Sequence, residues 1–284
     1  MSSLSLPVVS GELKLDVPED HVLLLTLNRP QALNAMTPNM TRDLRRVLDW
    51  FEDEPRLWVA IVTGAGRLFC AGADLKAWNE RAQNGDRHNE LERIQSETSG
   101  FGSLSRRHSR KPIVAAVIGG AFGGGLEILV NCDIIVASSD AKFAFPEVKR
   151  GVVAILGGIP RLARMCGHQL ASELLLLGKT IRADEAQTRF GFVNVVVPAD
   201  QVLSTAIAIA QEITENSPDA VQSTKAALLL AQEQGVEETF YSHVRGPEAK
   251  RVYEGENIKV CICRPRLLFL GIDLHWILFA GDPL

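Results

Sequence analysis

The first part of the chain carries two patterns of apolar positions, one with the period of a strand and one with the period of a helix. Residues 12–17 alternate polar and apolar side chains, and the apolar run 21–28 follows after a Pro-Glu-Asp turn, so the two segments predict a β-hairpin. Thr37 and Pro38 then have the character of an N-cap and a first helical residue. The apolar residues that follow share one face of the predicted helix and are Met40, Leu44, Val47, Leu48 and Phe51.

Three continuous apolar runs predict strands that are buried on both faces, as in a covered parallel sheet. They occupy residues 57–64, 112–119 and 133–138. A short helix that begins in a glycine run separates the last two, which is the pattern of a strand–helix–strand crossover. Residues 141–145 predict a further strand, and the polar stretch 78–109 predicts a helix interrupted at Asn84-Gly85-Asp86.

Helical patterns dominate beyond Gly157, with one short strand predicted in residues 193–198. Three longer helices are predicted over residues 199–216, 218–234 and 236–254. No sharp linker or internal repeat divides the chain. We therefore expect an α/β core over residues 1–198, a helical region over 199–259 and an atypical apolar tail over 260–284. The tail is too short and too interrupted by polar residues to predict a membrane span.

The composition provides enough apolar material for one large core, because 46% of the 284 residues are hydrophobic. The formal net charge is −4, and the arginines of the first long helix are outnumbered by its acidic residues. No basic surface for nucleic acid or anionic lipid is therefore expected. Small molecules and further copies of the chain are the expected partners.

Cysteine usage and the N-terminal residues predict a reducing intracellular compartment. The five cysteines are odd in number and scattered, and the chain does not open with a charged-then-apolar secretory segment. The cytoplasm is the default location, with mitochondria and peroxisomes as alternatives. Cys261 and Cys263 have no second pair to complete a zinc set, and the six histidines lack ligand spacing, so no metal site is predicted.

A glycine run and two glutamates form the candidate chemistry. Five of the seven residues 119–125 are glycine, so the backbone there can approach another group closely. A helix that begins near Gly124 directs free N–H groups at that place, which predicts a site for a developing oxyanion. Glu127 follows in the first turns of this helix, and Glu147 follows the next apolar segment. Taken alone, each glutamate is more often structural, as a helix-dipole partner or a surface carboxylate.

The chain resembles the crotonase, or enoyl-CoA hydratase/isomerase, superfamily over roughly residues 12–258, and six segments carry the resemblance in the family's order. They are LNRPQALNAM (27–36), IVTGAGRLFCAGADLK (61–76), KPIVAAVIGGAFGGGLEILVNCDIIVAS (111–138), FAFPEVKRGVV (143–153), GGIPRLAR (157–164) and ADEAQTRFGFVNVVVP (183–198). The resemblance implies a spiral of repeated ββα units with a C-terminal helical region. It also implies assembly as homotrimers or homohexamers and action on acyl-CoA thioesters.

The resemblance assigns roles to particular residues. The backbone N–H groups of Ala73 and Gly124 correspond to the pair that binds the thioester oxygen as it becomes an enolate. Glu127 and Glu147 correspond to the two carboxyl groups that hold a water molecule and exchange its proton. The loop that carries Ala73 continues into the expected CoA-binding residues, which are Asp74, Leu75 and Lys76.

The predicted function is that of an enoyl-CoA hydratase, a lyase of fatty acid and lipid metabolism that adds water syn to a 2-enoyl-CoA or removes it from a 3-hydroxyacyl-CoA. Coenzyme A is then part of the substrate, and no further cofactor is expected. Two alternatives stay open. The first alternative is an enoyl-CoA isomerase or a branched 3-hydroxyacyl-CoA dehydratase of a specialised biosynthetic pathway. The second is a CoA-binding pseudoenzyme, an alternative that arises because residues 260–284 replace the final helix of the family pattern.

Overall fold

The computed structural model of the protein describes residues 4–74 and 90–255. The chain divides into two compact units, which meet in sequence between Asn216 and Ser217. The sequence placed the start of the helical region earlier, at residue 199, but the first helix of that region packs on the sheet of the first unit. The apolar tail over 260–284 lies outside the described residues. Among the residues that are described, no helix is long and apolar enough to cross a membrane.

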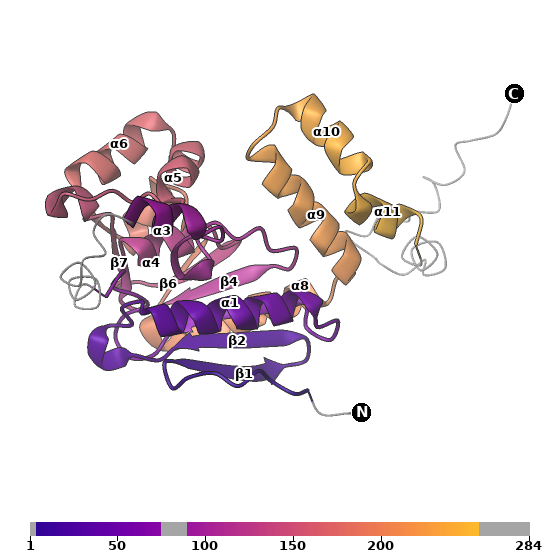
Figure 1. Cartoon of the computed structure of the whole chain (residues 1–284), viewed down its shortest axis with the longest axis horizontal. Coiled ribbons are helices and arrows are strands. Elements are labelled where there is room, and N and C mark those ends of the chain that lie inside the picture. The colour runs from indigo at the N-terminus through magenta and orange to yellow at the C-terminus, as the bar shows by residue number, and fades with distance from the viewer. Residues whose placement is uncertain (1–3, 75–89, 256–284) are drawn as a thin grey trace, which may run out of the picture. The chain divides into compact units, whose positions relative to one another are not determined.

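A six-stranded sheet forms the centre of the first unit, in the order β1-β2-β3-β4-β6-β9 (Figure 1). Its strands are β1 (Leu13–Glu19), β2 (Val22–Leu27), β3 (Val59–Gly64), β4 (Ile113–Val117), β6 (Ile134–Ser138) and β9 (Val195–Val197). The predicted hairpin is confirmed, since β1 and β2 pair antiparallel. Every later pair in the sheet is parallel, as the continuous apolar runs predict.

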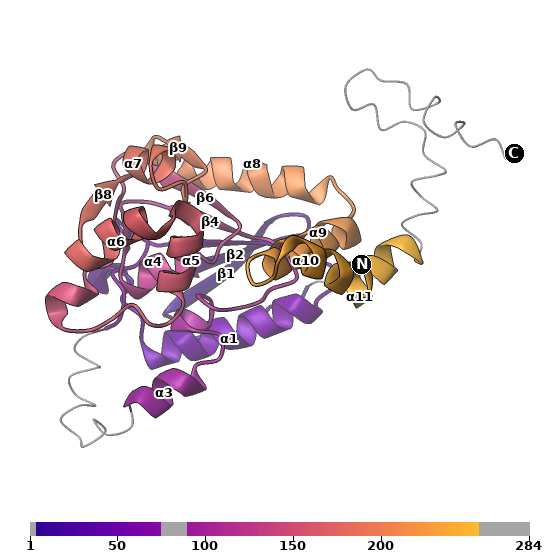
Figure 2. The same ribbon diagram turned by 90° about the horizontal axis from the view of Figure 1, so that it is seen from above.

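Helices α1 (Pro38–Asp53) and α8 (Val202–Thr214) cover the two faces of this sheet (Figure 2). Alternate residues of each strand face one helix or the other, because side chains alternate across a strand. On β3, Ala60 and Val62 belong to the core cluster that includes the apolar face of α1, whereas Val59 and Ile61 pack in the cluster of α8. All five apolar residues predicted for α1 are buried, and the Thr37 hydroxyl accepts the Met40 N–H as an N-cap.

A second, three-stranded sheet lies inside the same unit and has the order β5-β7-β8. Its strands are β5 (Gly120–Phe122), β7 (Lys142–Ala144) and β8 (Thr180–Arg182). The sequence predicts β7, but β5 is hidden in the glycine run and β8 is too short to show a pattern. Gly120 has a φ of 123°, and a Cβ there would lie 1.9 Å from the Lys142 carbonyl oxygen, so glycine is required for the pairing with β7.

Short helices and turns complete the first unit. They are α3 (Glu90–Ser96), α4 (Gly124–Leu129), α5 (Gly158–Cys166), α6 (His168–Leu177) and α7 (Ala183–Thr188), with 3-10 turns η1 (Pro30–Ala32), η3 (Phe101–Ser103), η4 (Glu147–Arg150) and η5 (Ala199–Gln201). The predicted helix over 78–109 is wrong beyond Ser96, because Gly100, Gly102 and Ser103 have positive φ angles. Its predicted break at 84–86 lies outside the described residues.

The second unit contains three described helices, α9 (Pro218–Ala231), α10 (Val236–Val244) and α11 (Pro247–Tyr253). The single helix predicted over 236–254 is divided in two, since Gly246 precedes Pro247 and proline cannot continue a helix without losing a backbone hydrogen bond. Ser223 and His243 connect α9 to α10 through an Oγ···Nε2 contact of 3.3 Å.

Candidate active site

Two backbone segments that are far apart in sequence lie side by side at the candidate site. Cys70 forms a parallel bridge with Ala121, and the Phe122 N–H donates to the Cys70 carbonyl at 3.0 Å. Two residues further along, Gly72 has a φ of 95°, and a Cβ on it would lie 2.9 Å from the Phe122 carbonyl oxygen and 3.6 Å from the Gly124 nitrogen. Glycine at position 72 therefore allows the loop 70–74 to approach the start of α4.

This approach brings together the two amides that the sequence singled out. Ala73 is bridged to Met36, but the hydrogen bonds of that bridge use the Gly72 carbonyl (2.8 Å) and the Asp74 N–H (3.2 Å). Gly124 is the first residue of α4, where an N–H has no acceptor within the helix. Within the described parts of the chain, the N–H groups of Ala73 and Gly124 have no hydrogen-bond partner. A pair of free amides of this kind can bind an anionic or polarised oxygen.

Phe101 covers Gly124 and explains why this position has no side chain. A Cβ on Gly124 would lie 2.5 Å from the Phe101 ring. The Phe101 N–H donates to the Ser105 hydroxyl at 2.7 Å, and that hydroxyl donates to the Leu156 carbonyl at 2.5 Å. Phe101 and Ser105 were not predictable from the sequence, because both lie in a segment that matches no motif and their ring and hydroxyl meet residues distant in sequence, Gly124 and Leu156.

Glu127 is a buried acid on α4, with only 3% of its surface exposed. Its carboxylate accepts the N–H of Gly158, the first residue of α5, at 3.0 Å. Burial raises its pKa from the ordinary 4.5 to about 7, opposed by hydrogen bonds from the Gly158 and Leu156 amides and assisted by repulsion from Glu147. A carboxyl with a pKa near neutrality can give or take a proton at physiological pH.

Glu147 is the first residue of η4 and also faces the glycine run. Its Oε1 lies 2.9 Å from the position that a Cβ on Gly123 would occupy. Its Oε2 is buried and has no hydrogen-bond partner in the described structure. Burial raises the pKa of this carboxyl as well. Since an unpartnered buried oxygen is costly, this group is suited to hold a proton or to meet a bound ligand.

The remaining predicted site residues differ in what can be said of them. Asp74 lies in the described loop and forms an ion pair with Arg29 at 3.0 Å. Leu75 and Lys76 lie outside the described residues. No cluster of three or more potential metal ligands occurs in the parts of the chain that the structure covers.

A cavity of about 360 Å³ opens beside Glu147, between η4, α5 and α6. Its lining is mostly apolar and includes Val153, Ala154 and Leu176, with His168 and Ser172 as polar groups. Several of the apolar lining residues are exposed large side chains. The cavity thus adjoins one of the two candidate carboxyl groups.

Comparisons with known proteins identify the family to which the chain is similar. The family model described as enoyl-CoA hydratase/isomerase matches residues 18–245. A mevalonyl-coenzyme A hydratase of Aspergillus fumigatus is 43% identical over 259 residues, which cover 90% of this chain and 92% of that protein. A second mevalonyl-coenzyme A hydratase, from Beauveria bassiana, is 46% identical over 226 residues, covering 78% of this chain and 80% of that protein. The crystal structure of an enoyl-CoA hydratase from Mycobacterium tuberculosis matches with a TM-score of 0.79 and 35% identity, over 89% of this chain and 95% of that one.

Proposed function

We propose a role for each site residue and a substrate for this chain, which belongs to the enoyl-CoA hydratase/isomerase family. The predicted crotonase fold and hydratase activity are confirmed, so the chain is a hydro-lyase of the enoyl-CoA hydratase type and its substrate is an acyl-CoA thioester. The observation that carries the assignment of roles is that two free amides, the buried carboxyl of Glu127 and the half-buried carboxyl of Glu147 lie at the glycine run.

The amides of Ala73 and Gly124 bind the thioester carbonyl oxygen. Its negative charge grows when water attacks the β-carbon and the α-carbon becomes part of an enolate, so donors placed there stabilise the transition state more than the ground state. Loss of one such donor typically costs about 100 to 1,000-fold in kcat. The position of Gly124 at the start of α4 adds the positive end of a helix dipole.

The carboxyl groups of Glu127 and Glu147 carry the proton transfers. One of them, ionised, accepts a proton from the attacking water, whose oxygen bonds to the β-carbon. The other, protonated, delivers a proton to the α-carbon as the enolate collapses, and the carbon–carbon double bond is lost. Burial raises the pKa of Glu127 to about 7, which keeps a proton available near neutral pH, and it raises the pKa of Glu147 in the same direction. The reaction transfers no electrons, and coenzyme A enters with the substrate, so we propose that it needs no separate cofactor.

The proposed substrate is a short, branched 3-hydroxyacyl-CoA with mevalonyl-CoA as the example, interconverted with its 2-enoyl product. Two relatives named mevalonyl-coenzyme A hydratases are 43% and 46% identical to this chain, whereas a relative named short-chain-enoyl-CoA hydratase is 38% identical over 217 residues. An unbranched 2-enoyl-CoA is the second candidate substrate.

Absorbance at the enoyl thioester band tests the roles and the substrate together. Mevalonyl-CoA should produce the band by dehydration, and crotonyl-CoA should lose it by hydration if unbranched substrates are accepted. Glu127→Gln and Glu147→Gln should each lower kcat by about 100 to 10,000-fold, as expected for a general acid–base group. Unchanged rates in both variants would remove the two-carboxylate mechanism, and a kcat/KM higher for crotonyl-CoA than for mevalonyl-CoA would remove the branched substrate.

We also propose that the chain assembles as a homotrimer or homohexamer. The support is an exposed apolar surface around the cavity beside Glu147, where Val148, Val153, Ile159 and Leu176 are 43%, 58%, 37% and 71% exposed. Clustered apolar side chains of this size mark interaction surfaces. Light scattering should give three or six times the chain mass, and Leu176→Glu should lower it. The control Val8→Glu changes a residue that is 85% exposed and should not.

A further inference from the structure

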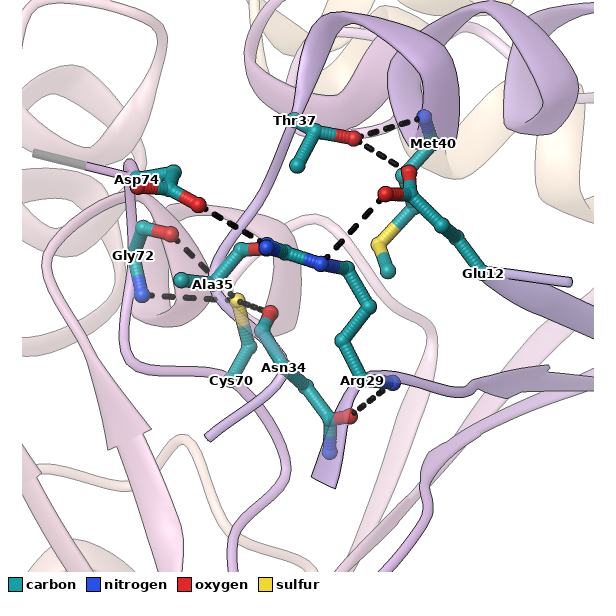
Figure 3. A network of polar contacts seen from close by, with 9 residues as sticks. All are labelled: Glu12, Arg29, Asn34, Ala35, Thr37, Met40, Cys70, Gly72 and Asp74. Atoms are coloured by element: carbon teal, nitrogen blue, oxygen red, sulfur yellow. Dashed lines mark hydrogen bonds and ion pairs between the residues drawn. The ribbon is translucent and has the colours of Figure 1, made fainter. Parts of the chain in front are cut away.

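Arg29 lies at the centre of a polar network behind the loop that carries Ala73 (Figure 3). Its Nη1 donates both to the Ala35 carbonyl at 2.6 Å and to Asp74 Oδ2 at 3.0 Å. Its Nε lies 3.4 Å from Glu12 Oε1 on the other side. The guanidinium group therefore stands between two carboxylates and one backbone carbonyl, in a half-buried position.

The two Nη1 contacts fall on either side of the short bridge between Met36 and Ala73. Ala35 precedes Met36, and Asp74 follows Ala73. That bridge has only two hydrogen bonds, and one of them is long at 3.2 Å. A typical net contribution of about 1 kcal/mol for each bond would hold the loop weakly. The same nitrogen atom joins both segments, so Arg29 clamps the bridge that fixes the Ala73 backbone.

Both ends of the Arg29 side chain are themselves fixed. At the backbone end, the Arg29 N–H donates to Asn34 Oδ1 at 2.8 Å, and the fully buried Asn34 donates to the carbonyls of Ala65 and Leu68 at 2.8 and 2.7 Å. At the other end, Glu12 accepts a hydrogen bond from the Thr37 hydroxyl, which caps α1 (Figure 3).

A thiol within the same loop adds two further contacts. Cys70 Sγ donates to the Asn34 carbonyl at 3.2 Å and accepts the Gly72 N–H at 3.4 Å. Together with Arg29, these contacts hold the backbone on both sides of Ala73, whose own N–H has no partner within the described structure.

We infer that Arg29, acting through Asp74 and the Ala35 carbonyl, is the positioning residue that aims the Ala73 amide at the thioester oxygen. The inference rests on the proposed role of Ala73. The planar guanidinium fork suits this task because its N–H directions are fixed, whereas a lysine ammonium is a flexible point charge. A misplacement of the donor by about 1 Å is enough to cost about 100-fold in rate.

Kinetics of Arg29→Met, Arg29→Lys and Asp74→Asn test this inference, with Arg42→Met as the matched control. Arg42 is an exposed arginine on α1 whose described partner is Asn39. We expect Arg29→Met to lower kcat by about 10 to 100-fold with KM changed less than about threefold, because a transition-state contact is weakened. The kcat of Arg29→Lys should lie between those of wild type and Arg29→Met. The double variant Arg29→Met/Asp74→Asn should be no slower than the slower of its two single variants, because both substitutions break the same contact.

A ligand that needs no turnover separates positioning from a general loss of stability. A 3-oxoacyl-CoA such as acetoacetyl-CoA forms an enolate with a near-ultraviolet band, and an oxyanion site raises the enolate fraction of the bound ligand. At saturation, Arg29→Met and Asp74→Asn should lower this band several-fold relative to wild type and to Arg42→Met. Melting temperatures are measured on the same samples.

The outcomes of these experiments distinguish a failure of the inference about Arg29 from a failure of the proposed function. If wild type hydrates its substrate but the Arg29 and Asp74 variants keep its kcat and its enolate band, the inference is wrong and the proposed function stands. The same holds if only the melting temperature or KM changes. If wild type itself shows neither turnover nor the band, the oxyanion role of Ala73 fails, and the inference fails with it.

Discussion

Replacing Glu127 by glutamine should make the protein more stable and nearly inactive, and the gain in stability should depend on pH. The cause is the burial of this carboxyl, which is 3% exposed and has its pKa raised from 4.5 to about 7. In the unfolded chain the group ionises at its ordinary pKa of 4.5. Between pH 4.5 and pH 7 the unfolded state has therefore lost a proton that the folded state keeps. The free energy of unfolding therefore falls as the pH rises from 4.5 to 7 and then stays level.

The size of the effect follows from the two pKa values. With about 1.4 kcal/mol for each tenfold change in proton affinity, the penalty is about 3 kcal/mol above pH 7 and about 1 kcal/mol at pH 5. Glutamine has no charge to bury, and its side-chain oxygen can still accept the Gly158 N–H. Glu127→Gln should therefore raise the free energy of unfolding by these amounts. At pH 8 the melting temperature should rise by about 5 to 10 °C.

Urea unfolding followed by circular dichroism, at pH 5 and pH 8 and at one protein concentration, measures this difference. The matched control is Glu212→Gln, which changes an exposed glutamate on α8 and should leave stability unchanged at both pH values. A Glu127→Gln protein no more stable than wild type at pH 8, or one whose advantage is larger at pH 5, would refute the reasoning that burial controls this carboxyl.

Three further predictions concern the framework of the site. Lys111 is 4% exposed and its Nζ donates at 2.6 and 2.8 Å to two carbonyls at the end of α1, so Lys111→Met should cost about 1 to 3 kcal/mol in urea unfolding. Gly120→Ala should cost about 3 kcal/mol or more, since its Cβ would lie 1.9 Å from a carbonyl of β7, while Gly11→Ala, with nothing within 4 Å, should stay within about 0.5 kcal/mol of wild type. Thr37→Ala should cost about 1 kcal/mol through loss of the α1 cap, and Thr37→Ser should restore most of it; equal melting temperatures for all three proteins would contradict the capping role.

The regular elements of the first unit were predictable because their apolar periodicity is a local property of the sequence. The hairpin, the capped helix α1 and the buried strands β3, β4 and β6 all follow from patterns within a few residues. The strand β5 was not predictable, since its glycines look like a loop and its pairing with β7 depends on a close backbone approach. Residues 236–254 form two helices divided at Gly246-Pro247, and the proline is a visible signal for this division. The prediction of one helix gave more weight to the longer helical pattern than to that proline.

The candidate site shows the same limit more sharply. Glycines and acids stand out in a sequence because their residue types already suggest chemistry. The supports of the site do not, because Ser105 and Gly158 act through a hydroxyl–carbonyl contact and a backbone N–H. Arg29 resembles any partly exposed arginine until the fold brings Asp74 to it across 45 positions of sequence. Such long-range contacts become visible only when the two loops are placed together.

The thiol under the Ala73 loop has a consequence for how the enzyme withstands oxidants. Burial raises the pKa of Cys70 to about 12 and leaves it fully shielded. Peroxides and alkylating reagents react with the thiolate, a form that this sulfur hardly ever adopts at cellular pH. The loop thus uses the soft hydrogen bonding of sulfur without acquiring a redox liability, and the shape of the catalytic pocket stays independent of the thiol balance of the cell.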